Sequence, residues 1–292
     1  MINRNSIAAA SAGLVMAGSL IYLAHRQVSD NRLRYGATTS VDTVVEAIEL
    51  FKDEGFDLET PLKAGRSYIP PVFLASLPDD LSSKPETYRR KAVFVAVVLA
   101  HVLWANEQVR MERSRIERIQ RANLAKRSLR TRDRKWLSQV AKKYRTKPMA
   151  FDELLRRVDV VPPRLAVAQA AQESGWGTSR FARAGNALFG QHASVGAGAI
   201  TAKGDTAVGM KAFPTIQQSV LGYMQNLNSH TAYREFWDMR AEMRQTGRPM
   251  DAIALAGFLG RYSEEGAIYV DRLRRVMRVP EVAAALGARL VE

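Results

Sequence analysis

The sequence predicts a mainly α-helical protein with a small β insertion. Apolar residues recur at helical spacing in several segments between residues 41 and 277, and one short glycine-rich stretch over 195–213 interrupts them. The chain has 292 residues, of which 47% are hydrophobic and 25% charged, and this balance is typical of a folded globular protein. It contains no cysteine, which excludes disulfides, thiolate zinc sites and a thiol nucleophile.

The N-terminal segment differs in kind from the rest of the chain. After Arg4, residues 6–24 form an uncharged run of 19 residues, about long enough to cross the hydrocarbon core as a helix. A cleaved signal peptide is the alternative, but the large Tyr22 does not fit the small residues that a cleavage site before residue 25 requires. We therefore expect a signal anchor or transmembrane helix over 1–25 and a polar linker over 26–40. Basic residues flank the run on both sides, so the positive-inside rule does not fix its orientation.

A helical, basic N-terminal region is expected next, over residues 41–147. Residues 41–56 have helical spacing, and five prolines between 61 and 85 then indicate an irregular segment. The apolar run 92–105 is too short to span a bilayer and is typical of a core helix, in which His101 would be packed. Helical spacing continues over 107–129 on a basic background.

The net charge of +14 is concentrated between Arg110 and Lys147, where fifteen lysine and arginine residues face three acidic residues. Such a stretch can bind nucleic acid, but no zinc-finger spacing, RNA-binding aromatic motif or heptad zipper accompanies it. A solvated helix face is the simplest alternative. For an envelope protein, attraction to an anionic membrane or to acidic wall polymers is the functional one. Nucleic acid is therefore an unlikely partner.

The second half of the chain reads as helices around one short strand region. Pro162 and Pro163 suit the start of a helix, where a missing N–H group costs nothing. That helix reaches Glu173 and breaks at Gly175 and Gly177. Glycines and short apolar pieces over 195–213 predict a hairpin of weak strands. Four further helical segments follow, at 219–227, 235–244, 250–259 and 267–277.

Three ordered blocks carry a family resemblance. They are AQESGWGTSRFARAGNALFGQ, FPTIQQSVLGYMQNLNSHTAYREF and LGRYSEEGAIYVDRLRRV. Together they resemble the bacterial glucosaminidases of glycoside hydrolase family 73, and most of all its Bax-like branch. The resemblance covers about residues 150–280, and it extends more loosely upstream through YIPPVFLASLPDDL.

The resemblance implies a lysozyme-like domain over residues 148–292. It also implies cleavage of β-1,4 bonds in peptidoglycan after N-acetylglucosamine, with glycan strands as the partner and no metal or organic cofactor. Such a substrate places the domain in the bacterial periplasm, held at the inner membrane by the N-terminal anchor. A lytic transglycosylase and a non-catalytic wall-binding protein of the same fold remain alternatives.

The residues themselves favour Glu173 as the catalytic acid. Glycosidic cleavage needs a carboxylic acid that is still protonated near neutral pH. The negative end of the helix dipole and burial beside Trp176 and the alanines both disfavour the ionised form of Glu173, and both raise its pKa. An exposed glutamate at a glycine-terminated helix is the ordinary alternative.

The second catalytic group is less defined. Asp205 is the sole acidic residue between Glu173 and Glu235, although an aspartate beside a glycine is also an ordinary turn residue. Tyr262 of the RYSEEG string matches a tyrosine that the family places near the reacting sugar, and core packing is its alternative role. Where many relatives of the wider family read Ala-Thr-Asp, this chain has Ser-Glu-Glu, which keeps Glu264 and Glu265 as further candidates.

Substrate contacts are expected from aromatic and polar side chains around these positions. Trp176, Phe189 and Tyr223 could stack on sugar faces, while Ser174 and Asn186 could bind hydroxyl or N-acetyl groups. Core packing is an equal alternative for Trp176 and Phe189. Asn186 also suits a structural role in the turn that ends at the second glycine of GNALFG.

Overall fold

The computed structural model describes residues 38–58, 68–85, 88–194, 199–201 and 208–291. The described chain is mainly helical, as predicted, with few strands. The expected N-terminal anchor and most of the linker lie outside the described residues, and so does Asp205.

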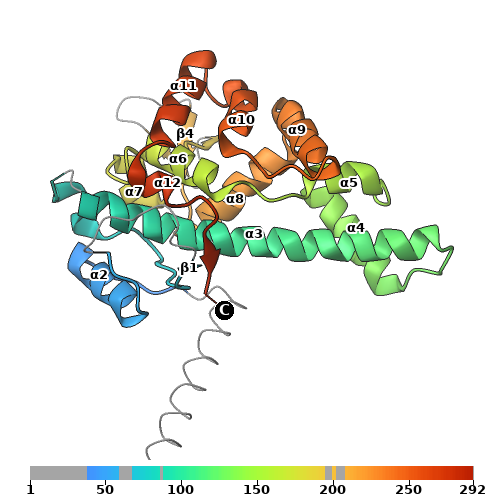
Figure 1. Cartoon of the computed structure of the whole chain (residues 1–292), viewed down its shortest axis with the longest axis horizontal. Helices are drawn as coiled ribbons and strands as arrows, with labels where there is room; N and C mark the ends of the chain where they lie inside the picture. Colours follow the sequence, from blue (N-terminus) through green and yellow to red (C-terminus); the bar gives the residue numbers. More distant parts are fainter. Residues whose placement is uncertain (1–37, 59–67, 86–87, 195–198, 202–207, 292) are drawn as a thin grey trace, which may run out of the picture.

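The long helix α3, Tyr88–Leu124, organises the whole molecule (Figure 1). Its first half is apolar on every side, and residues 92–100 are at most 1% exposed, so the prediction of a core helix at 92–105 is confirmed. His101 is fully buried, and its Nε2 lies 2.9 Å from the carbonyl oxygen of Leu74. Among the described residues, this helix alone is long and apolar enough to cross a membrane, but 89% of its apolar window is buried inside the protein.

Helices from both halves of the sequence pack against α3. Helix α2 (Val44–Asp53) lies on one side of it, while α6 (Pro163–Ser174), α8 (Ile216–Ser229) and α12 (Pro280–Ala283) lie on the other (Figure 1). One hydrophobic core joins buried residues between 44 and 105 to buried residues between 161 and 288. The boundary that we predicted at residue 147 therefore does not separate two cores.

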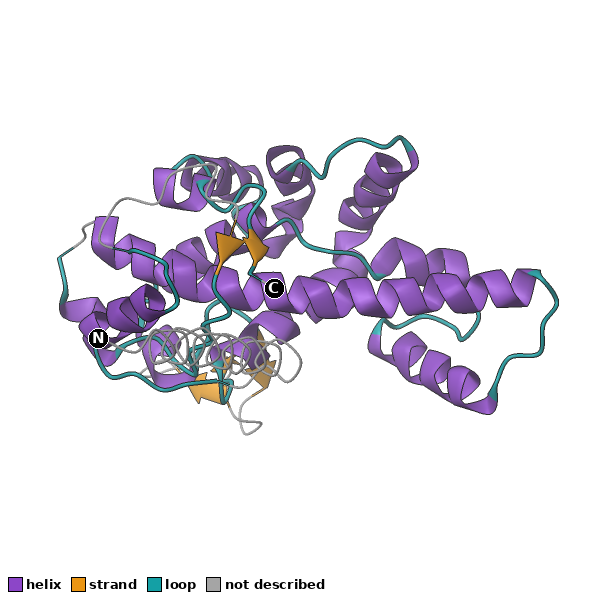
Figure 2. Ribbon diagram, turned by 60° about the horizontal axis from the view of Figure 1, so that its bottom comes forward, coloured by secondary structure: helices purple, strands orange, loops and turns teal. Residues whose placement is uncertain are grey.

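A second, smaller hydrophobic core lies along the distal half of α3, and we call it the arm core. Helices pack beside this half of α3 (Figure 2). There α4 (Thr131–Lys143) and α5 (Phe151–Arg157) bury Leu137, Val140, Tyr144 and Leu154 against α3. We call this α3–α4 projection, residues 106–147, the basic arm, because it carries the predicted stretch of positive charge. Each of its four acidic side chains is paired with a cation of the arm, and most of the arm's arginines and lysines are exposed to solvent.

The remaining predicted helices are present with small shifts in their ends. Helix α9 spans Arg234–Gln245, α10 spans Ala252–Ala256 and α11 spans Ala267–Val276. Helix α7, Arg180–Gly185, follows α6. The 3₁₀ helices are η1 (Asp79–Ser83), η2 (Thr231–Tyr233) and η3 (Gly257–Tyr262).

The hairpin that we predicted within 195–213 is present, and a third short strand precedes it. The three strands are β2 (His192–Ser194), β3 (Ala199–Thr201) and β4 (Val208–Lys211), and β4 lies between the other two in antiparallel pairing. A separate parallel pair joins β1 (Tyr68–Ile69) to β5 (Arg289–Leu290), which ties the C-terminal end to the segment before α3.

Candidate active site

The carboxyl end of α6 is held by an unusual turn. Gly175, Trp176 and Gly177 all have positive φ angles, of 59°, 59° and 79°. The buried hydroxyl of Ser174 donates to the carbonyl of Ala170 and accepts from the N–H of Gly177 at 2.9 Å. A methyl group at Gly177 would lie 2.4 Å from the Leu77 side chain, so the turn packs directly on the core. Ser174 thus has no exposed surface for the substrate contact that we expected.

Glu173 is one residue before the end of α6, and a chain of buried polar groups holds it. The hydroxyl of Tyr223 donates to Oε1 of Gln169 at 2.7 Å, and Nε2 of Gln169 donates to the hydroxyl oxygen of Tyr269 at 2.9 Å. Because that oxygen already accepts from Gln169, the hydroxyl proton of Tyr269 is free for its hydrogen bond with Glu173. The chain Tyr223–Gln169–Tyr269 therefore orients the carboxyl group.

The surroundings of Glu173 favour its protonated form. Burial raises the pKa of the Glu173 carboxyl above its usual value of 4.5, and the negative charge of Glu265 raises it further. The hydrogen bond from Tyr269 and the positive charge of Arg272 lower the pKa, but they do not cancel these effects. Sequence reasoning gave the correct direction and named burial, which is the largest cause.

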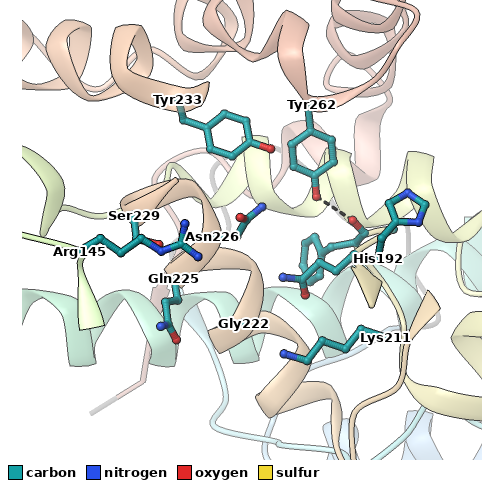
Figure 3. Close-up of a pocket in the computed structure, with 12 residues that line it drawn as sticks. Arg145, His192, Lys211, Gly222, Gln225, Asn226, Ser229, Tyr233 and Tyr262 are labelled. Carbon is teal, nitrogen blue, oxygen red and sulfur yellow. Dashed lines mark hydrogen bonds between the residues drawn. The ribbon is translucent and has the colours of Figure 1, made fainter. Parts of the chain in front are cut away.

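Gly190 connects Glu173 to an open pocket. Gly190 has a φ angle of 62°, and a methyl group in place of its hydrogen would lie 2.8 Å from Oε2 of Glu173. The carboxylate therefore rests against the glycine backbone, where a side chain would displace it. Gly190 also lines a cavity of about 410 Å³, a size typical of small-ligand sites (Figure 3). The full lining comprises Arg145, residues 189–192, Lys211, Gly222, Gln225, Asn226, Ser229, Tyr233 and Tyr262.

Tyr262 lines this cavity and lies near Glu173, as we expected. Its hydroxyl donates to the carbonyl oxygen of Phe189 at 2.7 Å (Figure 3), and its ring stacks on Tyr269 with centroids 5.6 Å apart. Burial raises the pKa of Tyr262 well above its usual value, and the charge of Glu173 adds to that effect. Tyr262 thus fixes the backbone next to Gly190 and contacts the tyrosine that holds the acid.

The other expected contact residues have structural partners. The ring of Phe189 stacks on the fully buried Tyr223, with centroids 4.0 Å apart. The amide of Asn186 donates to the carbonyl of Phe213 at 3.2 Å, from a left-handed position that ends α7. Trp176 packs edge-on against Phe94 and stays partly exposed beneath the Lys91 ammonium group. Of these four, Phe189 is the one that lines the pocket.

Several groups at the site were not predicted. Gln169 could have been found, because it precedes Glu173 by one helical turn and shares its face. Tyr269 and Gly190 have no local signal of this kind, since tertiary packing alone brings them to Glu173. Glu265, which we kept as an outside candidate, is exposed and paired with Arg272 at 3.0 Å. In the described part of the chain, no cluster of histidine and acidic residues could hold a metal ion.

Comparison with known proteins identifies the family of the chain. Residues 149–279 match the family described as glucosaminidase, mannosyl-glycoprotein endo-beta-N-acetylglucosaminidase. The chain is also 33% identical over 205 residues to "Protein bax" of Escherichia coli (strain K12), which covers 68% of this chain and 72% of that protein. No solved structure matches the chain. The chain belongs to the glucosaminidase family.

Proposed function

We propose that this protein is a peptidoglycan hydrolase that cleaves β-1,4 glycosidic bonds after N-acetylglucosamine, with Glu173 as the general acid. The observation that carries the proposal is the position of Glu173. Its carboxyl group is partly buried, has a raised pKa and rests against the backbone of Gly190 at the edge of an open pocket. A protonated carboxyl next to a cavity is what protonation of a leaving glycosidic oxygen requires.

The hydrogen-bonded series Tyr223–Gln169–Tyr269 is compatible with both protonation states of Glu173. In the protonated state, Glu173 can give its proton to the departing oxygen. In the ionised state, the hydroxyl of Tyr269 stabilises the new charge, since that hydrogen bond lowers the pKa of Glu173. Tyr269 therefore limits how strongly burial disfavours the carboxylate that forms in the reaction.

A second group must activate water or stabilise the developing positive charge on the sugar. Asp205 and Tyr262 remain our candidates. Glu265 joins them because its charge acts on Glu173 across the site. The hydroxyl of Tyr262 is bonded to the backbone in this state, so Tyr262 would act there by holding the pocket wall in place.

We further propose that the protein is anchored in the inner membrane through residues 1–25 and presents its catalytic domain to the periplasm. The basic arm would then bind anionic membrane lipid or acidic wall polymers, because most of its cations lie on a solvent-facing surface. A C-terminal reporter should be active outside the cytoplasm. A reporter active only in the cytoplasm would contradict both the topology and the substrate.

The catalytic proposal is tested by digesting purified sacculi with the wild-type protein and with Glu173→Gln. This change is nearly isosteric but removes the transferable proton, so activity should fall by about 10²–10⁴-fold or more. The exposed Glu235 provides the matched control, and Glu235→Gln should keep wild-type activity.

Mass spectrometry of the fragments identifies the reaction. Reducing N-acetylglucosamine ends are the expected product. Anhydro-muramic ends would instead indicate a lytic transglycosylase, and an absence of fragments would indicate a wall-binding protein. Activity of Glu173→Gln within about tenfold of wild type would contradict the assigned role.

A further inference from the structure

The pocket beside Glu173 has an uneven distribution of charge. Two of the twelve described residues that line it, Arg145 and Lys211, carry cationic side chains, and none of the twelve is acidic. The two cations enter from opposite sides and point into the cavity, while Tyr233 and Tyr262 form another wall (Figure 3). A neutral glycan would not require two positive charges in its binding site. The pocket is therefore suited to a ligand that combines sugar or amide groups with negative charge.

Arg145 occupies a position that normally favours glycine. It is the second residue after the end of α4, with a φ angle of 53°, and its N–H donates to the carbonyl of Lys142 at 3.2 Å. The next N–H, of Thr146, bonds to the carbonyl of Ala141 at 2.8 Å, so the pair forms the helix-ending turn in which glycine is most common. Helix termination therefore does not account for an arginine here.

Neither pocket cation has an ionic partner among the described residues. Arg145 is exposed and belongs to no ion pair of the described chain. Lys211 is also exposed, and its ammonium group lies 5.0 Å from the ring centroid of Phe213. By contrast, the neighbouring Lys143 is paired with Glu112 at 2.7 Å. The two pocket cations therefore remain available for an external anion.

We propose that this pocket binds the acidic part of a glycan, with Arg145 and Lys211 pairing with its carboxylate groups. The planar guanidinium of arginine can bind a carboxylate through two parallel hydrogen bonds, and a lysine on the opposite side adds a second charge-assisted contact. The amide side chains of Gln225 and Asn226 and the tyrosine wall supply the surface for the neutral part of the ligand.

The proposal assigns a role to the basic arm within the active site. The family match begins at residue 149, whereas Arg145 lies before it, at the end of the arm helix α4. The arm core and the Gln225 amide, which donates to the carbonyl of Lys143 at 3.4 Å, hold this end of α4 beside the pocket. The arm therefore completes a pocket that the family-matched segment forms only in part.

This inference rests on the proposed function for the identity of its ligand, so its test measures binding rather than cleavage. The Glu173→Gln protein is titrated calorimetrically at low salt with three soluble glycans of equal length. The first is a neutral chito-oligosaccharide, the second a peptide-free muramyl glycan with lactyl carboxylates, and the third a muramyl glycan with stem peptides. At least one acidic glycan should bind tenfold or more tightly than the neutral one, and the preferred probe shows which carboxylate is recognised.

Two variants and a matched control test the residues. In the same background, Arg145→Gly and Lys211→Gln should each remove most of the preference for acidic glycan. Arg145→Gly should not lower the melting temperature, because glycine suits the left-handed position better. Lys126→Gly is the control, since Lys126 has the same φ angle of 53° in the turn after α3, away from the pocket, and should leave the preference unchanged.

Equal affinity for neutral and acidic glycans would overturn the inference even if the enzyme cleaves sacculi. An acidic preference that survives both Arg145→Gly and Lys211→Gln would overturn it as well. Conversely, acidic binding that depends on these residues would stand even if no cleavage were found, so failure of the catalytic proposal remains distinguishable.

Discussion

Two carboxyl groups in this protein, one partly buried and one wholly buried, have pKa values shifted in opposite directions. Glu173 lies among tyrosines at the end of α6, and burial raises its pKa above 4.5. Asp159 lies between the main core and the arm core and is 1% exposed. Burial acts to raise the pKa of Asp159 too, but the hydrogen bonds from Arg244 and the charges of Arg240 and Arg113 outweigh it, so the pKa falls below 3.8. The identity of the neighbours, rather than burial, therefore decides which carboxylate stays ionised.

The contacts of Asp159 indicate a structural role, in contrast to the catalytic role that we propose for Glu173. Arg244 contacts both carboxylate oxygens of Asp159, and the fully buried Arg240 donates to its backbone carbonyl at 2.9 Å. These bonds join α9 to the segment that precedes α6, and none of the groups faces the pocket. Asp159 is thus a fixed charge that stabilises the fold, whereas the raised pKa of Glu173 favours the protonated form that our proposed mechanism requires.

The largest expected effect comes from removing the fixed charge. Asp159→Asn removes the charge that pairs with Arg244 and that compensates the nearby, fully buried Arg240, and loss of one partner of a buried pair costs about 3–5 kcal/mol. Urea unfolding should show this loss at neutral pH. Asp238→Asn is the control, because the Arg156–Asp238 pair is exposed and worth about 1 kcal/mol or less. Equal losses in the two variants would show that Asp159 is not a structural anchor.

The second effect tests the contact between Glu173 and Gly190. Gly190→Ala would place a methyl group 2.8 Å from the carboxylate oxygen and force Glu173 to move. A displacement of about 1 Å at a reacting group can cost about 10²-fold in rate, and sacculus hydrolysis should fall by that order. Gly55→Ala is the matched control, since Gly55 has a φ angle of 75° but nothing near its Cβ position. Should Gly190→Ala keep full activity, the glycine is not needed to seat the acid.

A smaller effect is expected from the tyrosine wall. Tyr262→Phe removes the hydrogen bond to the carbonyl of Phe189, and we expect turnover to fall at least tenfold with little change in the pH profile. A silent Tyr262→Phe together with an inactive Asp205→Asn would make Tyr262 a packing residue and restore a two-carboxylate mechanism.

Tyr269→Phe instead removes a hydrogen bond that lowers the pKa of Glu173, so the alkaline limb of the pH–rate profile should move to higher pH.

Local sequence placed Glu173 at the end of its helix because that position is defined locally. The helix, its glycine break and Glu173 lie within a few residues, and periodicity with helix-end preferences is enough to place them. The core helix at 92–105 was found for the same reason. The domain boundary at residue 147 stays a prediction, and both hydrophobic cores include residues on each side of it, since α3 contributes one half to each core.

Other parts of the site could not be predicted because they depend on distant segments. Gln169 and Tyr269 are 100 residues apart in the chain, and nothing around Tyr269 indicates its contact. Asp159 stands between two valines, and the arginines that hold it come from α3 and α9. Arg145 reads as one more basic residue of the arm until the fold places it at the pocket.

Carbon-13 NMR titration of the glutamate and aspartate side-chain carboxyl groups shows whether Glu173 is a carboxylic acid with a raised pKa beside Gly190. The signal that disappears in Glu173→Gln identifies the residue. We expect this carboxyl group to titrate above 4.5, while that of Asp159 titrates below 3.8 in the same protein. A Glu173 signal that titrates at or below 4.5 would contradict the account.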